Sequence, residues 1–306
     1  MAIDVEEIAA RARTTSKSYL DTKSILRDFL SELEFEQKQR GGRQVLTLSI
    51  SEMPGAVFVG DVHGDLRTLC ELLRRANLSE LIDRGYRIVF LGDYIDRGPE
   101  QLEALLFVAL LKQRLGSKVL TLRGNHEPLS WLPVYPHDFP YVLRARFGEE
   151  QSRELYALCR EVFEHLILLL YVPSKLIAVH GGPPITRVLS LERPEDILSV
   201  ESDNEALEDI LWSDPVDDLE TPWMYSYRGA GKLWGPQVTQ ATLRKLGIEL
   251  IIRAHEPCPI GYKLNHGGRV LTLFSMKGYY GNIAAAAMVT DIETVGKDIE
   301  KKMVLA

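Results

Sequence analysis

Six polar side chains stand directly behind short apolar runs in this sequence, and their types are those that bind transition metals. Two carboxylates, one amide and three imidazoles make a mixed set of oxygen and nitrogen donors, which suits Zn, Mn or Fe better than Ca. Clustered carboxylates repel one another, and a divalent ion removes that repulsion. We therefore predict a metal site built from Asp61, His63, Asp93, Asn125, His180 and His255.

The spacing of these residues predicts two ions rather than one. Asp61 and His63 are two positions apart, so at the end of an extended strand both side chains point the same way and can bind one metal. Asp93 has two carboxylate oxygens and can bridge to a second metal, whose site the other three candidates would complete. Two metals about 3.5–4 Å apart form a clamp for in-line displacement at phosphorus.

The elements that must position these side chains are short buried strands. Between the first three apolar runs, residues 66–77 and 101–115 have helical patterns. Strands alternating with helices indicate parallel pairing with right-handed crossovers. Ligands bind at the carboxyl ends of such strands, so we expect the candidates to converge on one cleft. The apolar runs cover residues 56–59, 87–91, 118–122, 175–179, 250–252 and 270–274.

The first forty residues are expected to be helical. Apolar residues recur at helical spacing from Ile25 to Leu33, and Gly41 and Gly42 end the pattern. Residues 46–50 alternate apolar and polar side chains, as a half-buried strand does. The sequence has no repeat, low-complexity tract or long linker. We therefore expect residues 1–306 to form one catalytic domain, on which residues 1–42 pack as a helical segment.

Composition argues against several other classes of protein. The 306 residues are 45% apolar and carry a formal net charge of −7, which fits a globular protein and disfavours a broad basic face for nucleic acid. The three cysteines are far apart, so neither a disulfide framework nor a thiolate zinc site is expected. Residues 1–12 lack the apolar core of a signal peptide, and the longest apolar run, residues 166–172, is too short to span a membrane. We expect a cytoplasmic protein without membrane contact.

The seven histidines fall into two groups. Four follow the apolar runs, and one of these, His126, stands next to Asn125 without being needed as a ligand. The remaining three lack this setting, and many histidines in proteins are half-buried without a function. We interpret as ordinary surface or core residues His137, His165 and His266.

Several motifs resemble those of the phosphoprotein phosphatase family, a branch of the calcineurin-like metallophosphoesterases. Its three signatures are matched by GDVHG at 60–64, GDYIDRG at 92–98 and GNHE at 124–127. Its later motifs are matched in order by HGG at 180–182, LWSDP at 211–215, RAH at 253–255 and the segment 273–281. The resemblance covers about residues 44–292 and implies an α/β metallophosphoesterase fold. In that fold a central β-sandwich of mixed sheets is flanked by helices, and the metal site lies at strand carboxyl ends.

The resemblance also implies a role for each site residue. One metal would be held by Asp61, His63 and Asp93, and the other by Asp93, Asn125, His180 and His255. His126 would be the general acid, oriented by Asp96. Substrate phosphate would be bound by Arg97, Arg228, Asn125 and Tyr279. Hydroxide formed between two ions of Mn, Fe or Zn would hydrolyse phosphate monoesters, with phosphoserine or phosphothreonine in a phosphoprotein as substrate.

Departures from the family pattern leave alternatives open. Tyr227 precedes Arg228 where the family more often has Asp or Asn, and the loop from Glu127 to Tyr141 does not resemble the eukaryotic branch. We expect a prokaryotic or archaeal-type member, to which no regulatory subunit is carried over. Relatives with the same metal motifs hydrolyse symmetric dinucleoside polyphosphates, which is the first alternative. The second, a non-catalytic binding module, would lack at least one ligand, and none is missing.

Overall fold

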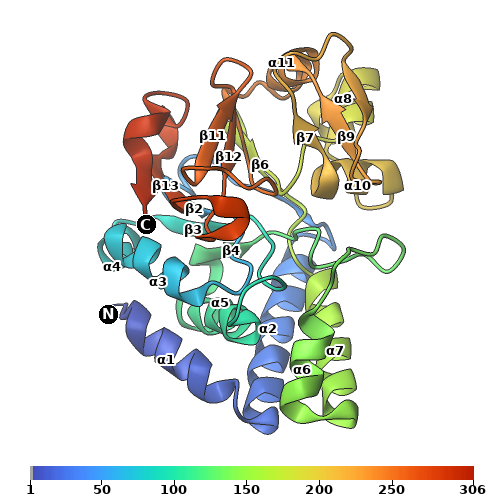
Figure 1. Ribbon diagram of the computed structural model, residues 1–306. Coiled ribbons are helices and arrows are strands. Elements are labelled where there is room, and N and C mark those ends of the chain that lie inside the picture. Colours follow the sequence, from blue (N-terminus) through green and yellow to red (C-terminus); the bar gives the residue numbers. More distant parts are fainter. Residues whose placement is uncertain (1–2) are drawn as a thin grey trace.

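Two β-sheets lie face to face at the centre of the computed structural model, which describes residues 3–306 (Figure 1). The larger sheet has the strand order β1 (Val45–Thr47), β5 (Leu169–Val172), β6 (Leu176–Ala178), β10 (Leu250–Arg253), β12 (Val270–Leu273) and β11 (Tyr262–Asn265). The second sheet has the order β14 (Met303–Leu305), β13 (Ala286–Asp291), β2 (Gly55–Val59), β3 (Arg87–Phe90) and β4 (Val119–Thr121). A small third sheet consists of β7 (Asp214–Pro215), β9 (Lys232–Trp234) and β8 (Trp223–Tyr225).

Strand pairing confirms the expected parallel arrangement. β2, β3 and β4 pair in parallel, and their crossovers contain α3 (Leu66–Arg75), α4 (Leu78–Asp83) and α5 (Gln101–Leu115). β6, β10 and β12 also pair in parallel. The six apolar runs divide between two sheets, with three strands in each. An apolar run that is buried on both faces carries no information about which strand it pairs with.

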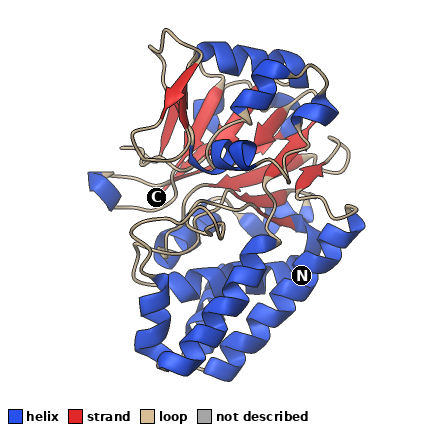
Figure 2. Cartoon of the chain, turned by 90° about the vertical axis from the view of Figure 1, so that its right-hand side faces the viewer, coloured by secondary structure: helices blue, strands red, loops and turns tan. Residues whose placement is uncertain are grey.

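The layers on either side of the sheets are helical. Along β2, Val57 and Val59 face the helices, whereas Ala56 and Phe58 face the other sheet, because side chains alternate along a strand. The outer face of the larger sheet is covered by α8 (Ile185–Ser190), α9 (Pro194–Ile197), α10 (Asn204–Trp212) and α11 (Pro236–Leu246). The helix, sheet, sheet, helix order is seen in Figure 2 and confirms the predicted α/β sandwich flanked by helices.

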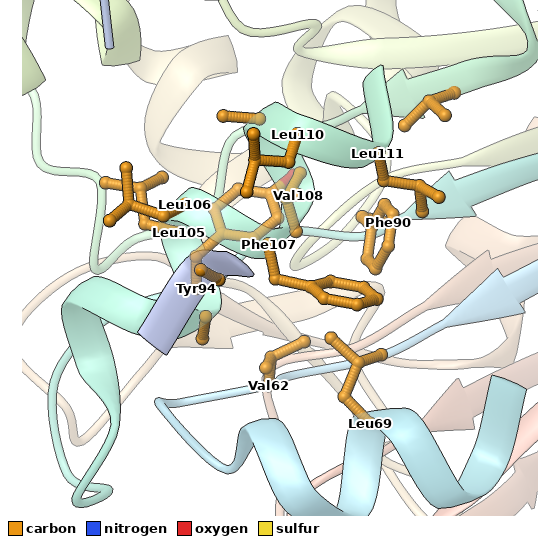
Figure 3. Packing of buried hydrophobic residues seen from close by; sticks show 14 of the residues in the cluster. Val62, Leu69, Phe90, Tyr94, Leu105, Leu106, Phe107, Val108, Leu110 and Leu111 are labelled. Carbon is orange, nitrogen blue, oxygen red and sulfur yellow. The ribbon is translucent and has the colours of Figure 1, made fainter. Parts of the chain in front are cut away.

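Helix α5 is enclosed by apolar side chains and connects the core to the candidate site. Figure 3 shows Phe107 of this helix pointing toward Val62 and Leu69. At its N-terminus, the Gln101 amide nitrogen donates to Asp138 Oδ2 at 2.7 Å, and its amide oxygen accepts from the backbone N–H of Asp96 at 3.1 Å. The predicted bounds, residues 101–115, match those of the structure. The N-terminus of a buried helix therefore fixes the end of the loop that carries Asp93, Asp96 and Arg97.

The N-terminal segment forms two helices rather than one. The Asp4 carboxylate accepts from the first amides of α1 (Val5–Thr15), and the Ser18 hydroxyl caps α2 (Tyr19–Gln39). Side-chain caps of this kind start a new helix, which explains the break at residues 16–18. α1 and α2 pack against α5, and α2 also packs against α7 (Glu149–Glu164), which follows α6 (Phe139–Phe147). The packing explains why the apolar residues recur at helical spacing in this segment.

The apolar run at residues 166–172 ends in the short buried strand β5. Leu170 and Val172 face the other sheet, and Leu169 faces the helical layer. Within residues 3–306, no helix is long and apolar enough to cross a membrane.

Deletion of residues 1–40 is expected to destabilise the protein severely. Five apolar side chains of α2 between Ile25 and Leu33 are buried, and each buried side chain of this size contributes about 1.5–3 kcal/mol. Their sum approaches the whole stability of a typical domain, about 5–15 kcal/mol. The milder change Phe29→Ala should lower the free energy of unfolding by about 3–5 kcal/mol. Denaturant unfolding measures both, with Phe35→Ala as the matched control, because Phe35 is 63% exposed. A stable, active 41–306 fragment would show that this segment does not belong to the catalytic fold.

Candidate metal centre and active site

The candidate ligands lie on loops at the carboxyl ends of strands from both large sheets. Asp61 and His63 follow β2, Asp93 follows β3, Asn125 follows β4, His180 follows β6 and His255 follows β10. All six side chains are buried, and the structure brings them together. The loops approach closely at Gly124, where a Cβ atom would lie 2.2 Å from Asp93 Oδ1. Only glycine leaves room for that contact.

Asp93 stands between two groups of donor atoms. Its Oδ2 atom lies 3.4 Å from His63 Nε2 on one side and 3.4 Å from His180 Nε2 on the other. Its Oδ1 atom accepts a hydrogen bond of 2.9 Å from the backbone N–H of His126. Burial opposes ionisation of Asp93, but the neighbouring His180 and His126 hold the pKa of this carboxyl well below its usual range. The geometry therefore presents one charged oxygen to both groups, as a bridging ligand requires.

The first group consists of Asp61, His63 and Asp93. Asp61 Oδ1 accepts from the backbone N–H of His255 at 2.9 Å, while Oδ2 lies 3.8 Å from His63 Nε2. His63 Nδ1 donates to the carbonyl oxygen of Ile95 at 2.8 Å, so Nε2 is the atom left to face the carboxylates. Burial and the charge of Asp93 raise the pKa of Asp61 to about 7, and burial lowers the pKa of His63 to about 4.

The second group consists of Asn125, His180 and His255 together with Asp93. Asn125 Oδ1 lies 2.9 Å from His180 Nε2 and 3.0 Å from His255 Nδ1. His180 Nδ1 donates to the carbonyl oxygen of Leu91 at 2.9 Å, which turns its Nε2 atom toward the site. Burial works against protonation of His180, but the Asp93 carboxylate raises its pKa to about 9. Burial and the charge of His180 hold the pKa of His255 well below its usual value.

The donor set fits divalent cations. Among residues 3–306, Asp61 Oδ2 and His255 Nε2 are buried polar atoms without a hydrogen-bond partner, which is costly unless another group satisfies them. Donor atoms lie within 4.8 Å of one another in two sets, one with Asp93, His180 and His255 and one with His63, Asp93 and His126. The second set contains His126 in place of Asp61, which sequence reasoning had grouped with His63 and Asp93. Metal content of a His126 variant therefore distinguishes a ligand from an acid.

His126 makes the contact with Asp96 that the general-acid hypothesis requires. His126 Nδ1 lies 2.6 Å from Asp96 Oδ2, so its other ring nitrogen, Nε2, is directed to the cavity and lies 3.4 Å from the Arg97 guanidinium. Burial of Asp96 would raise its pKa, but hydrogen bonds from His126 and His137 hold that pKa well below its usual range. Burial alone would lower the pKa of His126, but the charge of Asp93 and the hydrogen bond to Asp96 raise it.

The predicted phosphate-binding residues surround a cavity of about 670 Å³ above the candidate ligands. Arg97, Arg228, Asn125 and Tyr279 all contribute to its walls. Arg228 Nε donates to Asp214 Oδ2 at 2.8 Å, and the other oxygen of Asp214 accepts from Arg253 at 2.7 Å. Asp214 therefore holds Arg228 at the cavity edge, with 29% of its side chain exposed. Burial raises the pKa of the Tyr279 hydroxyl to about 12, so the phenol keeps its proton near neutral pH.

Three features of the site were missed by sequence reasoning. Glu127 lies in a recognised motif, yet its role as a brace was not foreseen: its buried carboxylate accepts from the backbone N–H groups of Asp93, Tyr94 and Gly124. His137, interpreted as an ordinary residue, contacts Asp96 Oδ2 at 2.7 Å. The third feature is a set of left-handed backbone conformations, at His63, Asp93, Asp96, Arg97 and His255. Such conformations cost free energy outside glycine and concentrate at functional sites.

Comparison with known proteins shows the family and the fold of this chain. The model of the calcineurin-like phosphoesterase family matches residues 56–259, two thirds of the chain. In solved structures, a protein serine/threonine phosphatase from Saccharomyces cerevisiae, described as similar to human phosphatase PP5, superposes with a TM-score of 0.72. That likeness covers 99% of this chain and 89% of the other at 20% sequence identity, and it supports the fold.

Sequence relatives identify the branch of this family to which the chain belongs. The serine/threonine-protein phosphatase 4 catalytic subunit of Saccharomyces cerevisiae is 31% identical over 294 residues, which is 94% of this chain and 89% of the relative. The subunit of the same name from Eremothecium gossypii is 34% identical over 240 residues, which is 76% of this chain and 73% of the relative. With the family match and the ordered motifs, these similarities show that the chain belongs to the calcineurin-like metallophosphoesterases and, within them, to the phosphoprotein phosphatase family.

Proposed function

We propose that this chain is a metal-dependent protein phosphatase that hydrolyses phosphoserine and phosphothreonine esters. The observation that carries the proposal is the position of Asp93 Oδ2, which lies 3.4 Å from a histidine nitrogen of each donor group. The relatives named for serine/threonine phosphatase activity support the choice of a phosphoprotein substrate. We also propose that the protein works in the cytoplasm, and no regulatory subunit is inferred.

The proposed metal sites share Asp93. Asp61 and His63 would complete one site, and the three residues of the second group, Asn125, His180 and His255, would complete the other. Two bound ions of Mn, Fe or Zn would supply a neutral-pH nucleophile from water and neutralise charge on the phosphoryl group. The imidazole and carboxylate donors of this chain suit each of these metals. Metal analysis of protein purified without chelator would identify the pair.

The remaining residues of the cavity bind the substrate and supply a proton. The Arg97 and Arg228 guanidinium groups reach the cavity from different segments of the chain, and each has the planar fork that matches two phosphate oxygens. His126 Nε2 lies at the cavity wall, so a proton on that atom can be donated to the departing serine oxygen. Asp96 accepts from Nδ1–H of the same ring, so a proton on Nε2 belongs to the charged imidazolium, which the Asp96 carboxylate stabilises.

Arg228→Lys should lower kcat/KM for a phosphoserine peptide by about 10–10²-fold, because a hydrogen bond to a charged group contributes about 1.5–3 kcal/mol. Lysine keeps the positive charge but cannot bond Asp214 and phosphate with one rigid fork. Initial-rate kinetics with the peptide measure the effect. Arg193→Lys is the matched control, because Arg193 is an exposed residue paired with Asp196 outside the cavity. An unchanged kcat/KM in Arg228→Lys would remove Arg228 from the phosphate site.

The dinucleoside polyphosphate alternative is favoured by one observation. Tyr135, Tyr227 and Tyr280 line the cavity and are 92%, 82% and 83% exposed, so their rings are free to stack against bases. A phosphoserine peptide and diadenosine tetraphosphate, assayed side by side at equal concentration, separate the two functions. The proposed function requires the larger kcat/KM for the peptide, and a larger value for the dinucleotide would replace it with the alternative.

A further inference from the structure

Asp96 accepts a complete set of hydrogen bonds from two directions. Its Oδ1 atom accepts from the backbone N–H groups of Asp138 and Phe139 at 2.9 and 2.8 Å. Its Oδ2 atom is shared by two imidazole rings, with His126 Nδ1 at 2.6 Å and His137 Nδ1 at 2.7 Å. The Asp96 side chain is fully buried, and an ionised carboxylate only accepts hydrogen bonds. Nδ1 of His126 and Nδ1 of His137 must therefore each carry a proton.

The His137 ring also has a hydrogen-bond partner at its second nitrogen, on the side away from Asp96. Its Nε2 atom lies 2.8 Å from the hydroxyl of Tyr156 on α7, and the two rings are 5.7 Å apart between centroids. With Nδ1 donating to Asp96, Nε2 of the same ring can accept a hydrogen bond from the Tyr156 O–H group. The side chain is only 16% exposed, so water has little access to replace either contact. The chain of contacts runs from Tyr156 through His137 and Asp96 to His126.

We propose that His137 is a positioning residue for the reaction, which holds the Asp96 carboxylate so that the His126 ring presents Nε2 to the leaving group. This inference rests on the proposed role of His126 as general acid. His137 lies outside the recognised motifs, and it is one of the histidines for which sequence reasoning expected no function.

Removal of the His137 ring would take one hydrogen-bond donor from Asp96 Oδ2, the atom that also holds the His126 ring. Asp96 Oδ1 would stay bound to two amides, but Oδ2 would keep the His126 ring as its sole donor among the contacts described above. A buried charge that loses a hydrogen bond draws its remaining donors or water toward it. The His126 ring would turn with Oδ2, and its Nε2 atom would leave the position from which it faces the cavity.

His137→Phe tests the proposal, because it keeps a ring of similar size and removes the donor. We expect kcat for a phosphoserine peptide to fall about tenfold, the lower end of what loss of an orienting partner costs. For p-nitrophenyl phosphate the loss should be about twofold, since that leaving group needs little protonation. KM and metal content should not change. His137→Asn should restore most of the activity, because its amide nitrogen can occupy the place of Nδ1.

Two further variants serve as a second test of the positioning role and as its control. Tyr156→Phe removes only the hydroxyl that holds His137, so it should give the same leaving-group dependence with a smaller loss. His165→Asn is the matched histidine control, because His165 contacts Gln37 on α2, outside the cavity, and should leave both activities unchanged. Melting curves show whether His137→Phe is folded at the assay temperature. If it is not, Tyr156→Phe decides, and an equal loss on both substrates, or no loss on either, overturns the proposal.

His126→Asn, measured in the same assay, tests the general-acid role of His126 separately from the positioning role of His137. If it shows a strong dependence on the leaving group and His137→Phe shows none, the role of His137 is wrong and the proposed acid stands. If His126→Asn loses activity equally on both substrates, the acid assignment and the role of His137 are both wrong. A leaving-group dependence in both variants, with partial recovery in His137→Asn, supports the proposal.

Discussion

Asp93→Asn should remove phosphatase activity and bound metal together. Its Oδ2 atom lies 3.4 Å from a histidine of each donor group, so loss of the charge weakens both proposed sites at once. The rate should fall by at least about 10³-fold, because a single electrostatic contact at a reacting centre is already worth about 10²–10³. Asparagine tolerates the left-handed backbone of this position (φ 55°) and can still accept from His126 N–H through its amide oxygen. The loss should therefore come from the missing charge rather than from misfolding.

The measurement pairs turnover of a phosphoserine peptide with metal content per protein molecule, both taken on protein purified without chelator. Asp83→Asn makes the same chemical change at an exposed residue at the end of α4 and should retain both metal and activity. Two metals and ordinary turnover in Asp93→Asn would show that Asp93 does not bridge. Full metal content with lost turnover would limit Asp93 to charge compensation within the site.

The parts of the site that could be predicted lie at strand ends. An apolar run followed by a polar cluster predicts a strand and a loop, and the parallel pairing of β2, β3 and β4 then places Asp61, Asp93 and Asn125 together. The bounds of α5 were also correct, because an apolar run of this length is too long for a typical strand and favours a buried helix. The same local pattern placed His180 and His255 near the others although they follow strands of the larger sheet, β6 and β10.

The parts that could not be predicted depend on contacts between distant segments. His137 is 41 residues from Asp96 and follows no strand, so no local pattern marks it as a partner of that carboxylate. Arg228 depends on Asp214 and, through it, on Arg253, a set of contacts that spacing does not encode. The left-handed conformations of Asp93 and the other site residues are imposed by the surrounding loops, since nothing in the identity of these residues requires them.

His126→Asn should separate proton donation from metal binding. Asp96 holds His126 Nδ1 at 2.6 Å and leaves Nε2 at the cavity wall, where it can protonate the departing oxygen. Loss of a positioned general acid slows such a step by about 10²–10⁴, so hydrolysis of a phosphoserine peptide should fall by that factor. An aryl phosphate with electron-withdrawing groups should lose much less, because its leaving group departs without a proton. Asp96→Asn should act in the same direction with a smaller loss, since the ring remains but its orientation is no longer fixed.

The donor geometry makes this the sharpest test of the site. His126 lies within 4.8 Å of the donor atoms of His63 and Asp93, close enough for a ligand, whereas its contact with Asp96 indicates an acid. Turnover on both substrates and metal content, measured on the same preparation, decide between the two. An acid predicts full metal content and a large difference between the substrates. A ligand predicts loss of metal and equal losses on both, and that outcome would transfer His126 from the proton-donating group to the first metal site.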